Sequence, residues 1–309
     1  MEEKREQLKK HGYKKSFGDW VFEILNGLFF LSFTLICSFP FYYLFINTIS
    51  DNRLVQAGAV NLYPVGIHFN NYLQMLEIRE LWQSVLVTTY RTVLGTGLMV
   101  LASAFVGYLV TQQQMFARKF IYRFIIVTMF FGAGLVPWFL NMSMLGLTNN
   151  FWGYIIPAIV SPFNIILVKT YIESLPKEME ESMFVDGAGH LCIFRSLILP
   201  LCKPILATIT VFGAVGHWNS FIDSIILMGA EPSLFTVQHR LFLYLNTATN
   251  LSNMVGSGEG LTQQMIDQAM RGRTLSLTIS MVTIIPILMV YPYMQRYFQK
   301  GLMLGAVKG

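Results

Sequence analysis

Long apolar runs constrain the fold of this 309-residue chain more than any other feature. A transmembrane helix needs about 20 mostly apolar residues, because hydrocarbon cannot hydrogen-bond to an exposed backbone. Six stretches reach that length, at about residues 21–47, 84–111, 120–142, 152–173, 204–228 and 275–295. The sequence therefore predicts an all-α membrane protein with six transmembrane helices.

Composition supports a membrane environment. The chain is 54% hydrophobic and 13% charged, whereas soluble domains carry roughly 25% charged residues. The net charge of +5 would suit a nucleic-acid-binding protein. However, the basic residues do not cluster on a soluble domain, so nucleic acid is not an expected partner.

The distribution of Lys and Arg predicts the orientation. All but six of the 22 basic residues fall on the side that holds the N-terminus, the exceptions being Arg53, Arg79, Arg91, Arg240, Arg271 and Arg273. Cytoplasmic loops carry the excess of positive charge. We therefore expect both termini in the cytoplasm, with a cytoplasmic N-terminal segment 1–19, a transmembrane domain 20–300 and a cytoplasmic tail 301–309.

Two long connections separate the predicted spans. Residues 48–83 form one loop, and residues 229–274 form another that contains a predicted short helix at 261–270. The longer loop would either contact a partner or serve as a plain connector. Within the second span, Ser103 and Gly107 form a small-xxx-small pair, which allows helices to approach closely.

The loop 174–200 has an unusual pattern for a connection between spans. Pro176 and the acidic residues that follow it favour a helix start. Gly187 and Gly189 predict a turn, and residues 191–199 form a second amphipathic stretch that we expect to end at Pro200. By itself, this pattern also fits an ordinary pair of interfacial helices.

The same loop resembles the EAA motif of permeases in binding-protein-dependent ATP-binding-cassette (ABC) importers. Glu181, Ser182 and Met183 occupy the positions of Glu-Ala-Ala, and Gly187 follows at the family's spacing. The stretch 197–200 (LILP) corresponds to the motif's Ile-x-Leu-Pro. The departures from the pattern are Ser182 and Met183 in place of two alanines, and Leu197 in place of isoleucine.

Other parts of the chain resemble the maltose-type second permease, in its oligosaccharide and polysaccharide subgroup. The similar segments are residues 62–72 (LYPVGIHFNNY), Trp218-Asn219 with Phe221, residues 235–238 (FTVQ) and the tail 297–309 (YFQKGLMLGAVKG). The resemblance implies the type I ABC importer permease fold. It also implies import of a sugar, favouring an oligosaccharide.

The resemblance implies a set of partners as well. They are a homologous second permease, two ABC ATPase subunits that carry ATP and Mg, and an extracytoplasmic solute-binding protein. The chain itself would be no enzyme and would bind no cofactor. Residues 180–195 would form the coupling helix, with Glu181 pairing to a basic ATPase residue; the implied coupling residues are Glu181, Ser182, Met183, Asp186, Gly187, Ala188, Leu199 and Pro200.

Motifs for chemistry within the chain itself are missing from the sequence. It has no G-x-x-x-x-G-K-[ST] phosphate loop, so ATP energy must come from a partner. Its five histidines are scattered and form no HExxH motif, which argues against a metal site. No Ser/His/Asp arrangement stands out, so no catalytic residue is expected.

Polar and aromatic residues within spans are the candidates for a sugar path. Such groups face a bundle interior or a water-filled cavity, and sugars bind to hydrogen-bonding groups and aromatic faces. The alternative is that these residues join helices or lie in the interfacial belt, with the partner permease making most substrate contacts. The candidates are Trp138, Asn141, Asn164, His217, Trp218, Asn219 and Asp223.

Three alternative functions stay open on the sequence. The same architecture serves non-sugar solutes such as amino acids, metals or phosphate. A secondary transporter driven by an ion gradient would show an inverted repeat and charges at mid-membrane, and neither is evident. A membrane scaffold without transport would tolerate disruption of the turn at Gly187.

Overall fold

The computed structural model describes residues 16–256 and 263–301. Within those ranges the chain is helical, with no β-strand. It divides into two compact units, of which the first ends at Phe69 and the second begins at Asn70.

The first unit is one long helix and the loop after it. Helix α2 (Phe17–Thr48) begins where the Asp19 carboxylate accepts the Ser16 backbone N–H at 2.8 Å, and it continues through Pro40. Most of its apolar side chains are exposed. Its length and composition suit a membrane span.

The loop folds back against the end of α2. The Tyr42 hydroxyl donates to the Leu62 carbonyl at 2.7 Å, and the His68 N–H donates to the Ile49 carbonyl at 2.8 Å. The short helix α3 (Asn52–Gln56) is capped by the Asp51 carboxylate. The predicted loop 48–83 is thus an ordered segment in its first half.

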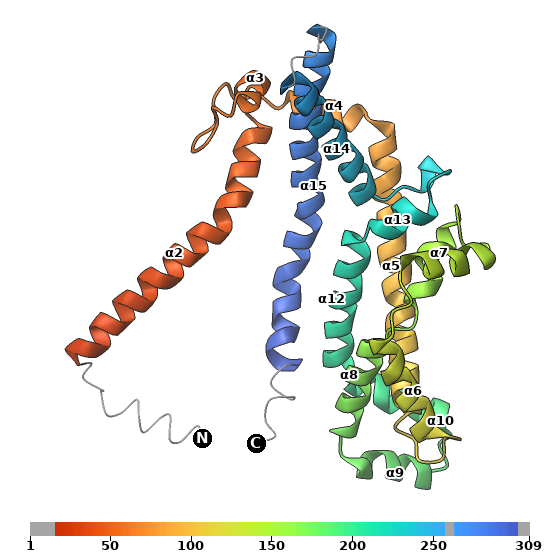
Figure 1. The fold of residues 1–309 in the computed structure, drawn as a ribbon. Coiled ribbons are helices and arrows are strands. Elements are labelled where there is room, and N and C mark those ends of the chain that lie inside the picture. The colour runs from red at the N-terminus through yellow and green to blue at the C-terminus, as the bar shows by residue number, and fades with distance from the viewer. Residues whose placement is uncertain (1–15, 257–262, 302–309) are drawn as a thin grey trace. The chain divides into compact units, whose positions relative to one another are not determined.

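The second unit is a helical bundle (Figure 1). Its elements, in order, are α4 (Asn70–Glu77), α5 (Arg79–Leu109), α6 (Arg118–Phe130), α7 (Leu135–Met144), η1 (Phe151–Tyr154), η2 (Ile156–Ala158), α8 (Pro162–Glu173), α9 (Lys177–Val185), α10 (His190–Ile193), the π-helix η3 (Phe194–Ile198), α11 (Leu199–Leu201), α12 (Lys203–Asn219), α13 (Ile222–Leu227), η4 (Pro232–Leu234), α14 (Val237–Gly256) and α15 (Gln263–Gly301).

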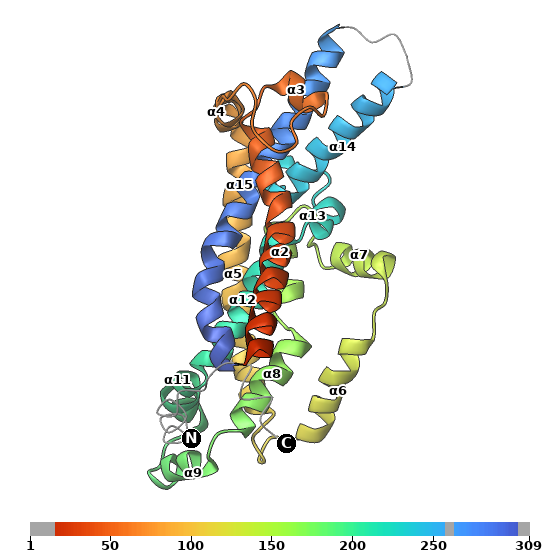
Figure 2. The same ribbon diagram turned by 90° about the vertical axis from the view of Figure 1, so that its left-hand side faces the viewer.

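Helix α5 is the central element of this bundle. It packs against α12 and α8, while α15 packs against α12 and α14. Helices α9 and α10 lie at one end of the bundle, and α13 and α14 lie toward the other (Figures 1 and 2). The helical connection 177–201 is therefore far from the segment that follows α12.

Small residues let these helices approach closely. A Cβ atom at Gly107 would lie 2.9 Å from Cγ1 of Val168 in α8, and one at Gly95 would lie 2.6 Å from the His217 ring in α12. Gly107 belongs to the predicted small-xxx-small pair, and its partner Ser103 is fully buried. Close approach at Gly107 agrees with that prediction.

The structure confirms the all-α class and modifies the list of spans. By length and composition, three described helices suit a membrane span, namely α2, α5 and residues 272–292 of α15. The number reaches five if two bent pairs each count as one span: η1 to η2 with α8, bent by 42°, and α10 to α11 with α12, bent by 79°.

The predicted span 120–142 is two helices rather than one. Helix α6 ends at Phe130 and α7 begins at Leu135. Gly132 and Gly134 lie in the break, and Gly134 has a φ of +88°, which favours glycine. Pro137 follows in the first turn of α7, where a missing N–H is tolerated.

Two further boundaries differ from prediction. The stretch 204–228 is interrupted after Asn219, so that α12 and α13 are separate helices. The predicted loop 229–274 contains the 20-residue helix α14, and α15 already begins at Gln263. Of the predicted short helix 261–270, residues 261 and 262 lie outside the described residues, and the remainder belongs to α15.

Candidate translocation and coupling sites

Helix α9 ends in a glycine turn. The Ala188 N–H donates to the Met183 carbonyl at 2.9 Å and the Gly187 N–H donates to the Phe184 carbonyl at 3.0 Å. This pair of bonds defines a Schellman motif, whose residue after the cap adopts a left-handed conformation. Gly187 holds that position with a φ of +81°.

The inner face of α9 is bonded to the end of α5. Glu180 Oε1 accepts hydrogen bonds from Gln112 Nε2 at 2.8 Å and from the Tyr108 hydroxyl at 3.2 Å. His190, just after the turn, lies 3.2 Å from Gln114 through its Nε2. The loop is therefore attached, on both sides of its turn, to the last turn of α5 and the residues that follow it.

The second half of the loop is one helical run into the core. Residues 190–201 continue through α10, η3 and α11, and Ile193, Phe194 and Ile198 are buried beside Tyr108. Pro200 does not end this run, contrary to prediction, because it lies in the first turn of α11. The sharp bend comes two residues later, at Cys202.

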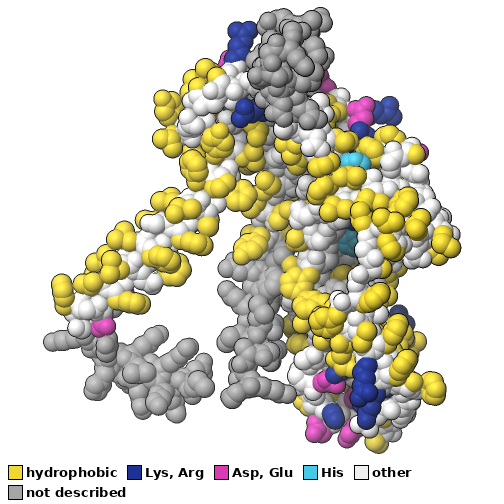
Figure 3. Space-filling view, viewed as in Figure 1, with side chains coloured by type: hydrophobic (Ala, Val, Ile, Leu, Met, Phe, Trp, Pro, Cys, Tyr) yellow, Lys and Arg dark blue, Asp and Glu magenta, His cyan; other side chains and the backbone are white. Residues whose placement is uncertain are grey.

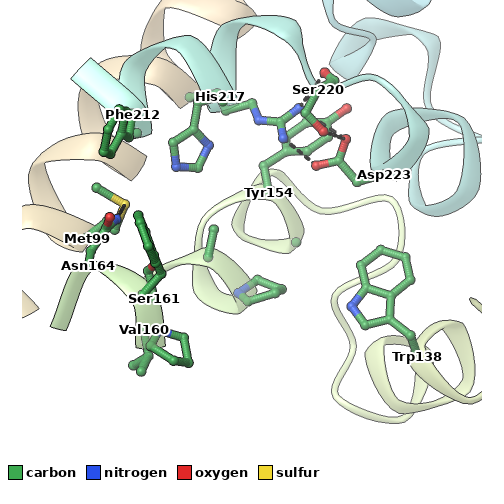
Figure 4. A pocket seen from close by; sticks show the side chains of 18 residues that line it. Met99, Trp138, Tyr154, Val160, Ser161, Asn164, Phe212, His217, Ser220 and Asp223 are labelled. Atoms are coloured by element: carbon green, nitrogen blue, oxygen red, sulfur yellow. Dashed lines mark hydrogen bonds and ion pairs between the residues drawn. The ribbon is translucent and has the colours of Figure 1, made fainter. Parts of the chain in front are cut away.

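A cavity of about 690 Å³ opens between α5, η1, η2, α8 and α12. Aromatic side chains contribute much of its wall, namely Trp138, Tyr154, Phe163 and Phe212. Figure 4 shows His217 and Asn164 on one side of this space and Asp223 on another. The wall therefore combines hydrogen-bonding groups with aromatic side chains.

An ion pair lies in the cavity wall at the break between α12 and α13. Arg91 Nη1 donates to Asp223 Oδ1 at 3.2 Å and to the Ser220 carbonyl at 3.1 Å, and Nη2 pairs with Asp223 Oδ2. The Arg91 guanidinium also lies over the Tyr154 ring, 4.6 Å from its centroid. The side chain of Arg91 is 3% exposed and that of Asp223 is 19% exposed.

A buried hydroxyl network continues from this pair toward α14. The Tyr154 hydroxyl donates to the Leu234 carbonyl at 2.7 Å and lies 2.8 Å from Ser224 Oγ. Ser224 Oγ lies 2.9 Å from His239 Nδ1 in α14. Burial lowers the pKa of His239 below its ordinary value, and the neighbouring Arg240 lowers it further.

Comparison with known proteins places the chain in a family. The polygalacturonan/rhamnogalacturonan transport system permease protein YtcP of Bacillus subtilis (strain 168) is 30% identical over 292 residues, which cover 94% of this chain and 99% of that protein. The chain belongs to the permease subunits of carbohydrate ABC importers. Such subunits are not enzymes themselves, and they work with ATPase subunits and substrate-binding proteins.

Other comparisons agree with this assignment. The arabinooligosaccharides transport system permease protein AraQ of Halalkalibacterium halodurans is 25% identical over 295 residues, covering 94% of the permease and 96% of AraQ. A chain from the crystal structure of a bacterial ABC transporter involved in the import of the acidic polysaccharide alginate matches with a TM-score of 0.79 and 31% identity. That match covers 92% of the permease and 99% of the other chain. A search of protein-family profiles finds no match.

The predicted substrate-path residues separate into two groups in the permease. Trp138, Asn164, His217 and Asp223 line the 690 Å³ cavity. Trp218 instead donates its indole N–H to the Thr283 carbonyl in α15 at 3.1 Å, so it joins two helices. Asn219 is exposed beside Gln238, and Asn141 lies with Trp138 in a separate hollow outside the cavity.

Sequence reasoning missed several residues of the cavity wall. Arg91 was assigned to the extracytoplasmic side, but it lies inside α5, buried at the cavity. A charged residue within an apolar run is itself a signal of a functional site, and that signal was available. Tyr154 and Ser220 carried no comparable signal, because tyrosine and serine are common in spans.

The predicted coupling residues lie together at one end of the bundle. Glu181, Ser182, Asp186 and Gly187 are exposed, whereas Met183, Ala188 and Leu199 pack against the core; Pro200 is exposed. The motif assigned the ATPase contact to Glu181 and gave no role to Glu180; in the structure Glu181 faces outward, and Glu180 binds the end of α5 and the residues after it. Among the described residues, no group of three His, Cys, Asp or Glu side chains has the arrangement of a metal site.

Proposed function

We propose that this permease carries an oligosaccharide across the bacterial inner membrane as one of two homologous permeases. An extracytoplasmic binding protein delivers the sugar, and two ATPase subunits, which hold ATP and Mg, bind the loops of the two permeases from the cytoplasm. Both termini lie in the cytoplasm. The observation that carries the proposal is the two-sided character of loop 174–200, which is bonded to α5 on its inner face and exposed on its outer face.

The outer face of α9 suits an ATPase cleft. Glu181 is exposed, and Phe184 and Val185 are exposed apolar side chains beside it. Apart from its chain neighbours, no other atom of the described structure would lie within 4 Å of a Cβ atom at Gly187. Apolar side chains next to one carboxylate provide packing area together with a charged partner for a basic residue. We assign Glu181, Ser182, Asp186 and Gly187 to this contact. Met183, Ala188, Leu199 and Pro200 support it.

The inner face of α9 provides a route for force. A displacement of α9 would act on α5 through Glu180, Gln112 and Tyr108. The same helix carries Met99 and Arg91 in the cavity wall. Closure of the ATPases would thereby change access to the cavity, as alternating access requires.

The cavity is the substrate path on this side of the complex. Its volume of about 690 Å³ falls within the usual range of roughly 300–1,000 Å³ for ligand sites. Trp138 offers an aromatic face, and Asn164, His217 and Asp223 offer hydrogen bonds. Asn141, Trp218 and Asn219 lie outside this cavity. Relatives named for polygalacturonan/rhamnogalacturonan and for arabinooligosaccharides favour a chain of sugar units as the substrate.

The test uses the tagged permease purified with its partners. We expect ATPase subunits and a second permease to co-purify, and we expect proteoliposomes to take up labelled oligosaccharide only with ATP and the binding protein. Vanadate should abolish the uptake, and Glu181→Ala should reduce it. Uptake that follows an ion gradient without ATP hydrolysis would establish a secondary transporter instead. ATP-dependent uptake of a non-sugar solute alone would refute the substrate class.

A further inference from the structure

The N-terminal turns of α6 carry two cations without a partner. Lys119 and Arg123 are exposed, and neither makes a hydrogen bond or ion pair with any residue in the described ranges. They are four residues apart and so share one face of the helix. Like charges at this spacing destabilise a helix, and a bridging anion would remove the repulsion.

The neighbouring cations Arg118 and Lys169, in contrast, have partners within the chain. Arg118 Nη1 donates to the Thr111 carbonyl at 2.9 Å, which joins α6 to the end of α5. Lys169 of α8 pairs with Glu173 at 2.8 Å and lies 4.4 Å from the ring centroid of Tyr122. Internal contacts therefore account for Arg118 and Lys169 but not for Lys119 and Arg123.

Exposed aromatic side chains flank the two cations. Phe116 is 90% exposed and Phe120 is 70% exposed, with Phe124 one turn further along α6. An open hollow of about 680 Å³ lies beside them, lined by Gln113, Ala117, Arg118, Lys119 and Phe120. Cations next to exposed aromatic rings are typical of the membrane interface, where headgroup phosphates meet acyl chains.

We propose that this end of α6 binds the headgroup of an anionic phospholipid. Lys119 and Arg123 contact the phosphate, Gln113 donates from its side-chain amide, and Phe116 and Phe120 lie among the upper acyl segments. A membrane lipid fits better than a soluble phosphate, because the exposed apolar face of α6 continues from Phe120 toward Phe130, where acyl chains would lie below the headgroup.

The proposed lipid site lies close to the coupling loop 174–200. Arg118 holds the start of α6 to Thr111, and Gln112, the next residue, holds Glu180 of α9. Figure 2 shows the start of α6 at the same end of the bundle as α9, and Figure 3 shows Lys and Arg side chains gathered at this end. The assignment to the cytoplasmic leaflet rests on the proposed orientation.

Lipid binding is measured on the delipidated full-length permease by native mass spectrometry. The probes are dioleoyl-phosphatidylglycerol, dioleoyl-phosphatidylcholine and inorganic phosphate. We expect phosphatidylglycerol to bind more tightly than phosphatidylcholine, and Lys119→Gln with Arg123→Gln to weaken it by about tenfold. The double variant Arg53→Gln with Arg79→Gln removes two exposed cations elsewhere and should bind as the unmodified protein does.

Charge-conserving substitution separates binding from folding. Lys119→Arg with Arg123→Lys should retain phosphatidylglycerol, even if the glutamine variant is poorly folded. Undiminished phosphatidylglycerol binding by the glutamine variant would overturn the proposal, and so would displacement of the lipid by millimolar phosphate. Failure of ATPase subunits to co-purify would count against the proposed function alone, because lipid retention is measured on the permease itself.

Discussion

Arg91 in α5 and Asp223 in α13 form a bidentate ion pair in the wall of the 690 Å³ cavity, although they are 132 residues apart in sequence. Ser220 Oγ and the Ser224 N–H also donate to Asp223 Oδ1, at 3.0 and 2.9 Å. These bonds engage both carboxylate oxygens and hold the break between α12 and α13 beside α5. A complete buried ion pair changes the free energy of folding little, whereas removing one partner leaves an uncompensated buried charge and destabilises the fold strongly.

Removing one partner of this pair should destabilise the permease. Asp223→Ala leaves the Arg91 guanidinium buried and uncompensated, at a cost of about 3–5 kcal/mol. We expect a clear drop in the melting temperature and yield of the purified complex. Arg91→Met with Asp223→Leu should recover much of the loss, because no buried charge remains. A double variant as unstable as the single one would show that the pair is not the cause.

The turn at Gly187 offers a matched pair of substitutions. A Cβ atom at Gly187 or at Gly189 would meet nothing within 4 Å, but only Gly187 has a positive φ. Gly187→Ala should therefore strain the loop by about 1–2 kcal/mol, and Gly187→Pro should break it. We expect both variants to insert normally and to lose coupling between ATP hydrolysis and uptake, measured in proteoliposomes.

Gly189→Ala serves as the control for that experiment. Its φ of −77° suits any residue, so uptake per ATP hydrolysed should stay near the level of the unmodified protein. If Gly187→Ala and Gly189→Ala lowered uptake per ATP hydrolysed equally, the added methyl group would be the cause, and not the left-handed backbone conformation at Gly187.

The Glu180 contact with α5 predicts a separation of binding from force transfer. Glu180→Ala removes the acceptor for Gln112 and Tyr108 and leaves the exposed Glu181 in place. We expect ATPase subunits to co-purify normally while uptake per ATP falls several-fold. Glu178→Ala, which removes an exposed carboxylate from the same helix, should change neither quantity. Loss of ATPase binding in Glu180→Ala would place Glu180 in the interface itself.

Close packing between α5 and α8 predicts intolerance at Gly107. A Cβ atom there would lie 2.9 Å from Val168 Cγ1 and 3.3 Å from the Lys169 backbone nitrogen. Gly107→Ala should cost about 1–3 kcal/mol through overpacking, seen as a lower melting temperature. Gly97 lies on the same helix with nothing within 4 Å. Gly97→Ala should be neutral or slightly stabilising, and a similar loss at both positions would contradict the packing argument.

His239 predicts a pH dependence of stability. Its folded-state pKa is lowered by burial and by Arg240, so the unfolded chain binds a proton more readily than the folded one. Stability should be unaffected by His239 at pH values above its ordinary pKa of about 6.5 and should fall as the pH drops below it. His239→Gln should lessen the fall in melting temperature between pH 7.5 and 5.5. An unchanged pH slope would contradict the prediction.

The features that could be predicted from the sequence are those that depend on a short run of consecutive residues. Apolar runs predicted the membrane class and the long spans, because a bilayer imposes a minimum length on any helix that crosses it. The spacing from Glu181 to Pro200 identified the importer family, and Gly187 occupies a turn whose geometry depends on a few consecutive residues. These features need no knowledge of distant contacts.

Tertiary packing decided the rest. Helix α14 is polar enough to resemble a loop, and it is stabilised by packing against α15 and α5. The interruption after Asn219 is held by Arg91 from another helix, and Glu180 joins α9 to Tyr108 and Gln112 at the end of α5. Each of these depends on which side chains meet across the bundle, and hydrophobic periodicity carries no information about such pairings.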